Sequence, residues 1–338
     1  MPPDKIDAQI CYLLTTPCDT PVPLNAPESI RPLKDAPYFT PIDIVIRALD
    51  SETIELENVA VTIRRQVYDG LTQVAECFYA LPDVLSRDAF HLKARIQTAL
   101  RAHLHGAGEI SEEYTALLVT QFDGTPAEFI ERNGQSLARF LRSQRERFDP
   151  QEISDVVMSR ARYSESELTV VDWDGAIVIS PDGDFQSDIE LFKIGNYQLL
   201  RYRLLDQAIE RNLRTVNDRL LTGARSLLPN RSRRIMRESI EQRLAIMLEF
   251  EKIDQNLLLI GDWYTAKLYQ IIYDEFYLDE WKSAIQSKLG NLESINQLIQ
   301  DNLTFSWSSF LEFMQIVGWL ILLVGYFVLF FLEASKGR

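Results

Sequence analysis

Residues 167–180 read ELTVVDWDGAIVIS and contain two apolar runs on either side of Asp174 and Gly175. Both runs are rich in β-branched residues, which favour strands. An Asp-Gly pair also tolerates the positive φ angles that a two-residue hairpin turn requires. This stretch therefore predicts a β-hairpin, and residues 113–122 (EYTALLVTQF) predict another strand upstream of it.

Two helix start signals lie between that strand and the hairpin. Thr125, Pro126 and Glu128 supply an N-cap, a first-turn proline and a capping-box acid. Residues 149–152 repeat the pattern with Asp, Pro and Glu. The order strand, helix, helix, hairpin is typical of a small α+β domain, which we place at residues 42–186.

Composition limits the class of protein. The chain has 338 residues, and 35 Lys plus Arg against 49 Asp plus Glu give a formal charge of -14. This charge argues against a general binder of nucleic acid or anionic lipid. Cys11, Cys18 and Cys77 are too few and too scattered for a disulfide framework, so we expect free thiols in a reducing compartment. Residues 1–41 hold nine of the fourteen prolines and are expected to form a proline-rich arm.

The sequence after the hairpin predicts helix almost without interruption. Ser187 and Glu190 form a capping box for a long helix that should end near Gly223. Two further long helices are expected after a turn at Pro229, one over residues 231–273 and one from Asp279 to Leu303. We therefore expect residues 187–309 to form a helical hairpin or stalk.

The C-terminal region contains a membrane-span pattern. Residues 313–332 (FMQIVGWLILLVGYFVLFFL) are twenty consecutive uncharged residues, enough for a helix to cross a hydrocarbon core. We place a transmembrane helix at 310–333 and a short tail at 334–338. Without an N-terminal export signal, the protein is expected to be tail-anchored, with its soluble part in the cytoplasm. Lys336 and Arg338 favour the opposite orientation by the positive-inside rule.

The hairpin is followed by a cluster of acids. Oxygen ligands at the spacing of Asp182, Asp184 and Asp188 are candidates for calcium or magnesium. The alternative is a polar turn followed by acids at a helix N-terminus. The sequence contains no nucleophile elbow, phosphate loop or dinucleotide motif, so it predicts no cofactor and no catalytic residue and favours a non-enzymatic protein.

Nine arginines and no lysine occur between Arg211 and Arg243. A planar guanidinium suits pairing with phosphate or carboxylate groups. The residues predicted to bind a partner are Arg231, Arg233, Arg234 and Arg237. The alternative is ion pairing within the chain or between subunits.

The third long helix carries a heptad pattern that predicts a coiled-coil seam, with a core asparagine of the kind that sets register and oligomer number. Its positions are Ile285, Leu289, Leu292, Asn296, Ile299 and Leu303. The alternative is packing against another helix of the same chain.

Four segments carry a family resemblance. They are VVDWDGAIVI (170–179), ELFKIGNYQLLRYRLLDQAIE (190–210), IGDWYTAKLY (260–269) and LEF (311–313), which opens the span. Together they resemble the required-for-meiotic-nuclear-division family, a group of uncharacterised-domain proteins of bacteria and mitochondria. The resemblance implies a membrane-anchored, oligomer-forming protein, which in mitochondria supports or tethers the translation machinery at the inner membrane. It implies no catalytic residues.

The sequence thus predicts an α+β domain, a helical stalk and one transmembrane helix. We expect a single-pass scaffold or tether that contacts the bilayer through residues 313–332, forms a homo-oligomer and recruits a partner, either RNA and the ribosome or an acidic protein. A bacterial inner membrane is favoured over the mitochondrial one. One alternative is a subunit of an oligomeric CorA-like ion pathway, although the Gly-Met-Asn loop of that family is absent. The other is a hydrolase or nucleotide-binding enzyme.

Overall fold

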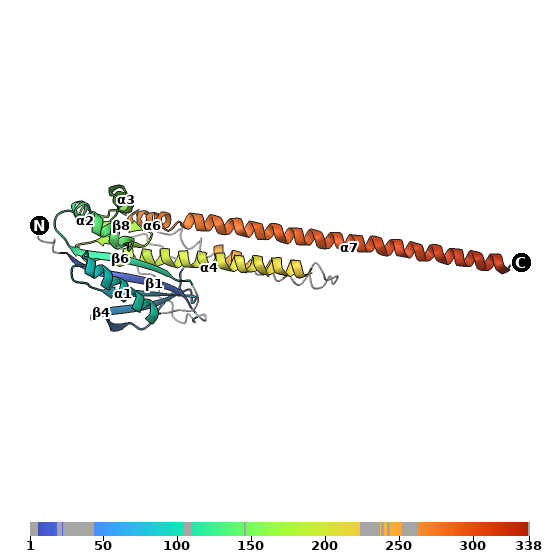
Figure 1. Cartoon of the computed structure of the whole chain (residues 1–338), viewed down its shortest axis with the longest axis horizontal. Helices are drawn as coiled ribbons and strands as arrows, with labels where there is room; N and C mark the ends of the chain where they lie inside the picture. The colour runs from blue at the N-terminus through green and yellow to red at the C-terminus, as the bar shows by residue number, and fades with distance from the viewer. Residues whose placement is uncertain are drawn as a thin grey trace. The chain divides into compact units, whose positions relative to one another are not determined.

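A computed structural model of the chain describes residues 6–18, 22, 44–104, 110–144, 147–223, 237, 240–241, 244–251 and 263–336. The chain divides into two compact units. Figure 1 labels the helices and strands along the chain. Unit 1 contains residues 1–206 and 249–285, and unit 2 contains residues 207–248 and 286–338. The sequence placed the end of the α+β domain at residue 186, whereas unit 1 also includes the following helical residues up to 206 and a second helical segment.

Within the described residues, unit 1 is built on a nine-stranded sheet in the order β2-β4-β5-β1-β6-β9-β8-β7, with β3 also paired to β4. The strands are β1 (Asp7–Pro17), β2 (Ile46–Ala48), β3 (Glu52–Leu56), β4 (Val59–Tyr68), β5 (Thr72–Tyr79), β6 (Glu112–Gln121), β7 (Arg160–Ala161), β8 (Leu168–Asp172) and β9 (Gly175–Ile179). All described pairs are antiparallel except β6 with β9, which is parallel.

Strand β1 lies inside the range 1–41 that the sequence assigned to a proline-rich arm. It pairs with β5 on one side and β6 on the other, so it is central to the sheet. Ile10, Tyr12 and Leu14 are buried on one of its faces. The high proline content of the whole range obscured an apolar run that is long enough for a strand.

The hairpin of β8 and β9 is present, but its turn is displaced by one residue. Asp172 pairs with Gly175, so Trp173 and Asp174 form the turn. A side chain at position 175 would place its Cβ 2.6 Å from the backbone oxygen of Thr115. Glycine is therefore required at this position by the close approach of β6, not by the turn.

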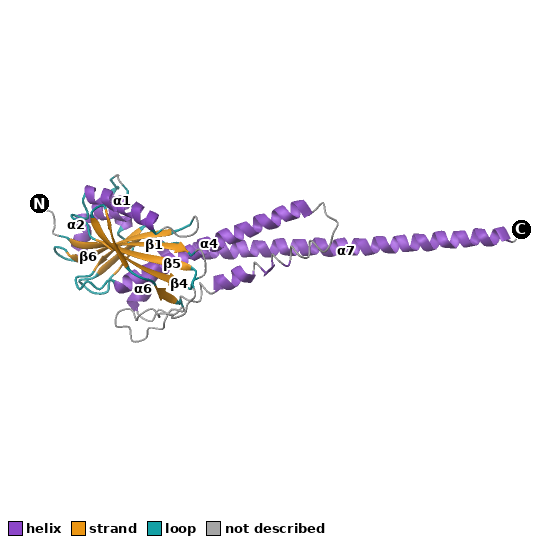
Figure 2. Ribbon diagram, turned by 90° about the horizontal axis from the view of Figure 1, so that it is seen from below, coloured by secondary structure: helices purple, strands orange, loops and turns teal. Residues whose placement is uncertain are grey.

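Helices cover both faces of the sheet. On one face lie α1 (Arg87–His103), α2 (Pro126–Leu141) and α3 (Pro150–Val156). The predicted capping box of α2 is present at Thr125 and Glu128. The main apolar core fills the space between these helices and the sheet, with buried members from both. Figure 2 shows α1 and α2 on one side of the sheet and α6 (Trp263–Glu275) on the other.

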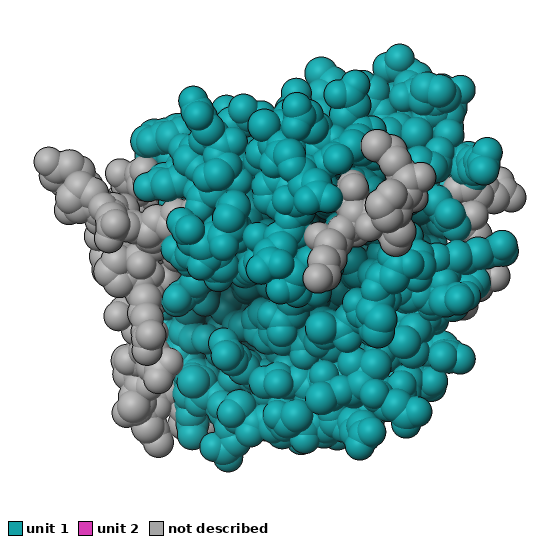
Figure 3. Space-filling view, turned by 90° about the vertical axis from the view of Figure 1, so that its left-hand side faces the viewer, with its two compact units in different colours: residues 1–206, 249–285 teal, residues 207–248, 286–338 magenta. Residues whose placement is uncertain are grey.

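The second face is covered by α6 and by the first part of α4 (Gln186–Gly223). These two helices approach closely, because a Cβ at Gly195 would lie 2.6 Å from the side chain of Ile272. Tyr114 of β6 packs its ring 5.2 Å from the rings of both Phe192 and Phe276. Figure 3 shows the surface of one side of unit 1.

Unit 2 contains the later part of α4 and most of α7 (Leu278–Lys336). Lys288 donates a hydrogen bond to Glu210 at 3.0 Å. The helix predicted over residues 231–273 falls partly outside the described residues; residues 244–251 and α6 are helical. The third predicted helix begins at Leu278 and continues to Lys336.

The end of α7 contains the apolar segment that the sequence predicted. Residues Leu311–Val328 are long and apolar enough to cross a membrane, and none of this segment is buried. Large side chains along it are exposed, for example Trp319 at 69% and Leu322 at 70%. The fold class predicted from sequence, an α+β domain followed by long helices and one apolar C-terminal helix, is confirmed.

Candidate functional site

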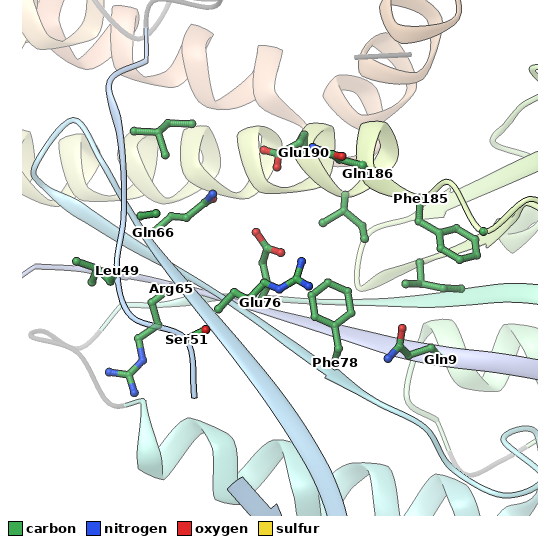
Figure 4. Close-up of a pocket in the computed structure, with 16 residues that line it drawn as sticks. Gln9, Leu49, Ser51, Arg65, Gln66, Glu76, Phe78, Phe185, Gln186 and Glu190 are labelled. Atoms are coloured by element: carbon green, nitrogen blue, oxygen red, sulfur yellow. The ribbon is translucent and has the colours of Figure 1, made fainter. Parts of the chain in front are cut away.

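Unit 1 contains a pocket of about 860 Å³ between the sheet and the first turns of α4 (Figure 4). Strands β1, β4, β5 and β6 form its floor, α4 forms its roof, and the residues around β2 form a third wall. Its lining includes Gln9, Arg64, Gln66, Glu76, Phe78, Leu118, Gln186, Ile189 and Glu190. A pocket of this size is in the range of small-molecule sites in proteins.

The alternation of β4 and β5 places polar side chains on this floor. Ile63 and Cys77 belong to the apolar core on the opposite face. Because successive side chains of a strand point to opposite faces, Arg64 and Glu76 point toward α4. These two residues are also direct cross-strand partners. Figure 4 shows Glu76 pointing from the sheet toward the helix that carries Glu190.

Three lining residues, Gln66, Glu76 and Glu190, form the inner end of the pocket, and all three bond Lys193 of α4. The Lys193 side chain is 0% exposed. The Nζ atom donates to Glu76 Oε1 at 2.5 Å, to Glu190 Oε1 at 2.7 Å and to Gln66 Oε1 at 2.9 Å. All three ammonium donors therefore have acceptors, and these bonds connect α4 to β4 and β5.

The charges of this cluster are set by burial and proximity. Burial lowers the pKa of Lys193, but the neighbouring Tyr68, Glu190 and Glu76 outweigh it, so its pKa lies above the usual lysine range. Burial raises the pKa of Glu190, although Lys193 opposes this rise. The inner end of the pocket thus contains one ammonium group and two carboxyl groups.

A second set of contacts positions the pocket wall around β2. Tyr197 of α4 donates a hydrogen bond to Asp69 at 2.7 Å, and its ring lies 5.5 Å from that of Tyr68. The backbone N–H of Val45 donates to the other carboxylate oxygen of Asp69 at 3.1 Å. Asp69 therefore joins α4, the turn after β4 and the segment that begins β2.

Arg64 lies at the outer part of the pocket and is exposed. Its guanidinium carbon lies 5.3 Å from the ring centroid of Phe78, which is cation–π distance. Among the described residues, no ion pair involves Arg64, because its cross-strand partner Glu76 is turned toward Lys193. The neighbouring Arg65 pairs with Glu52 instead.

The acids proposed as metal ligands are separated in the structure. Asp188 is buried and accepts hydrogen bonds from Thr169 at 2.7 Å and from Tyr264 at 2.8 Å. Asp182 and Asp184 are exposed in the loop before α4. The described ranges contain no group of three or more acidic, histidine or cysteine side chains placed to hold a metal.

The predicted arginine site is mostly outside the described residues, which exclude Arg231, Arg233 and Arg234. Arg237 is exposed, and its Nε atom donates to Glu241 at 2.9 Å. This is an i, i+4 pair of the kind that the alternative interpretation expected. Partner binding by these arginines stays a prediction.

The predicted oligomer seam is described in part. Ile285, Leu289 and Leu292 are buried within the single chain. This burial agrees with the alternative of packing within one chain for these three positions. The side chains of Asn296, Ile299 and Leu303 lie outside the description, so the seam stays a prediction there.

Sequence reasoning missed the pocket and its charge cluster. Two local signals were present: Glu76 interrupts an apolar strand (VAECFY, 74–79), and Lys193 interrupts an apolar helical run (LFKIG, 191–195). Charged residues at apolar positions are rarely buried unless they are paired. The two residues are more than a hundred positions apart, so their pairing could not be read from either segment.

The fold and the pocket define a class: an α+β sheet domain with helices on both faces, on the same chain as an apolar helix. Residues 46–186 match the family described as "Uncharacterized protein MJ0711, N-terminal domain". The chain is similar to the uncharacterized protein MJ0711 of Methanocaldococcus jannaschii, with 26% identity over 231 residues that cover 67% of this chain and 69% of the relative. No solved structure matches.

These similarities support a relationship to an uncharacterised-domain family. They do not specifically support the required-for-meiotic-nuclear-division family that the sequence motifs resemble. The matched range begins at β2 and ends at Gln186, the first residue of α4.

Proposed function

We propose that this protein is a non-enzymatic, single-pass membrane scaffold, anchored by residues 311–328, that self-associates and recruits a partner to the membrane. The observation that carries the proposal is the apolar end of α7, of which none is buried within the chain. Eighteen helical residues span about 27 Å, close to the roughly 30 Å hydrocarbon thickness of a bilayer. An apolar surface of this length is costly in water.

The orientation and the partner follow the sequence-based reasoning. The soluble units lie on the cytoplasmic side, and the arginine segment around Arg237 binds RNA, a ribosome or an acidic protein. The resemblance of the VVDWDGAIVI and IGDWYTAKLY motifs to the required-for-meiotic-nuclear-division family supports a tether of the translation machinery. No observation of the described residues favours the ion pathway or the enzyme over the scaffold.

Self-association is supported by an apolar row in unit 2. The residues Ile240, Leu244, Met247 and Leu248 are 46%, 56%, 40% and 59% exposed. Their spacing places them on one face of a helix. An exposed apolar helix face of this kind is what a second copy of the chain would cover.

The anchor is tested by carbonate extraction of membranes that contain the full chain. Leu320→Lys combined with Leu323→Lys places two charges near the middle of the span, each costing about 2.5–3.5 kcal/mol of insertion free energy. We expect this variant to be recovered in the soluble or aggregated fraction, while the control with alanine at both positions stays in the membrane. Soluble unaltered chain, or full retention of the lysine variant, would contradict the anchor.

Self-association is tested by native mass spectrometry of the detergent-solubilised chain. Leu244→Glu with Leu248→Glu places charges on the apolar row, and we expect it to lower the oligomer number. The control Gln207→Glu adds a charge at another exposed position of unit 2. A monomeric unaltered chain, or an unchanged oligomer in the double variant, would refute this part of the proposal.

A further inference from the structure

We propose that the pocket between the sheet and α4 binds a small zwitterion, in which a primary ammonium group is joined by a short linker to an anionic group. The ligand ammonium donates to the Oε2 atoms of Glu76 and Glu190, whose Oε1 atoms bond Lys193, and the anionic group contacts Arg64. Free amino acids and the ethanolamine phosphate of lipid headgroups both have this chemistry. The inference goes beyond the scaffold function and does not depend on the membrane anchor.

The inner end of the pocket is suited to a cation. Glu76 and Glu190 both line it, and both bond Lys193 through Oε1. Among the described residues no hydrogen bond reaches Oε2 of either carboxylate. The single ammonium group of Lys193 faces the two carboxylates of Glu76 and Glu190, which leaves one negative charge unbalanced. A ligand ammonium would supply the missing positive charge and would donate hydrogen bonds to the two Oε2 atoms.

The outer part of the pocket is suited to an anion. Arg64 is positively charged, its guanidinium stacks on Phe78, and it forms no ion pair with the described residues. A stacked guanidinium keeps its edge free for a carboxylate or phosphate. The side chains of Gln9 and Gln186 line the same pocket and supply amide donors.

The separation of the two ends fits a short ligand. Arg64 and Glu76 are direct cross-strand partners, and such pairs have Cβ atoms about 5 Å apart. A ligand whose charges are a few bonds apart therefore reaches both. Between and around these ends, Leu118 and Ile189 add an apolar surface for the remainder of the ligand.

The experiment is isothermal titration of the detergent-solubilised full chain with individual standard amino acids and, separately, with O-phosphoethanolamine. We expect at least one of these probes to bind. Glu190→Gln and Arg64→Gln should each weaken its affinity about tenfold or more, the effect of losing one charge-assisted hydrogen bond. Binding by amino acids identifies a soluble ligand, whereas binding by O-phosphoethanolamine alone identifies a headgroup.

The variants are chosen to keep the fold. Glu190→Gln leaves Lys193 paired with Glu76, and Arg64 is exposed. Circular dichroism melting checks that both variants are folded. Glu76→Gln, which leaves the Lys193–Glu190 pair, is a second test of the end that binds the ligand ammonium. The matched controls are Glu131→Gln and Arg95→Gln, at exposed positions of α2 and α1 on the opposite face, and they should bind like the unaltered chain. If no probe binds, or if the pocket variants bind as well as the controls, the inference is wrong.

Discussion

Replacing Lys193 by methionine should destabilise unit 1 strongly. Methionine is similar in length to lysine and fills the same space, but it provides no charge and no donors. Glu76 and Glu190, whose side chains are only 8% and 15% exposed, would then face each other without their shared cation. Removing one partner of a buried ion pair costs about 3–5 kcal/mol in free energy of unfolding.

Thermal unfolding of the detergent-solubilised chain, followed by circular dichroism at pH 7, measures this loss. For a domain of this size a loss of 1 kcal/mol lowers the melting temperature by about 2–4 °C, so the expected fall is roughly 10 °C. Lowering the pH should reduce the difference, because burial raises the pKa of Glu190 and its protonation removes one of the two unpaired charges. Combining Lys193→Met with Glu76→Gln and Glu190→Gln should recover most of the stability, because this triple variant contains neither of the two unpaired charges.

Lys267→Met, at an exposed position of α6, is the control and should shift the melting temperature little. The prediction is wrong if Lys193→Met lowers the free energy of unfolding by less than about 1 kcal/mol, or if the triple variant is no more stable than the single one. Either result would mean that the ion pairs of Lys193 with Glu76 and Glu190 do not stabilise unit 1.

Three further predictions concern other parts of the chain. Burial lowers the pKa of Lys93 to about 8 from its usual 10.5, so the charged form is disfavoured in the folded state. The free energy of unfolding should therefore rise by about 3 kcal/mol between pH 8 and 10.5. Urea titrations measure this rise, and Lys93→Met should remove it. Gly195→Ala should cost about 1–3 kcal/mol by melting, because its Cβ would overlap Ile272, whereas Gly290→Ala, which meets nothing within 4 Å, should not destabilise; equal effects would argue against the close helix contact. Deleting residues 311–338 should release a folded chain from membranes, and its recovery in carbonate-washed membranes would contradict the anchor.

The sequence predicted those features that depend on neighbouring residues. The capping box of Thr125, the hairpin and the apolar end of α7 are each encoded within about twenty positions, and all are present. Strand β1 was missed because its partners, β5 and β6, follow it by many residues and its own surroundings are rich in proline. The Lys193 cluster was missed for a related reason: three elements must come together before a buried lysine has partners.

The position of α6 in the chain has a consequence for the order of folding during synthesis. Helix α6 packs on β7 and β8, and the hydroxyl of its Tyr264 donates a hydrogen bond to Asp188 of α4. About ninety residues separate the end of β8 from the start of α6. At roughly 5–20 residues per second, the ribosome needs about 5–20 s to make that segment. During this time α4 is made, but the part of the sheet formed by β7 and β8 still lacks α6, so a chaperone that shields these two strands would protect the nascent chain in this interval.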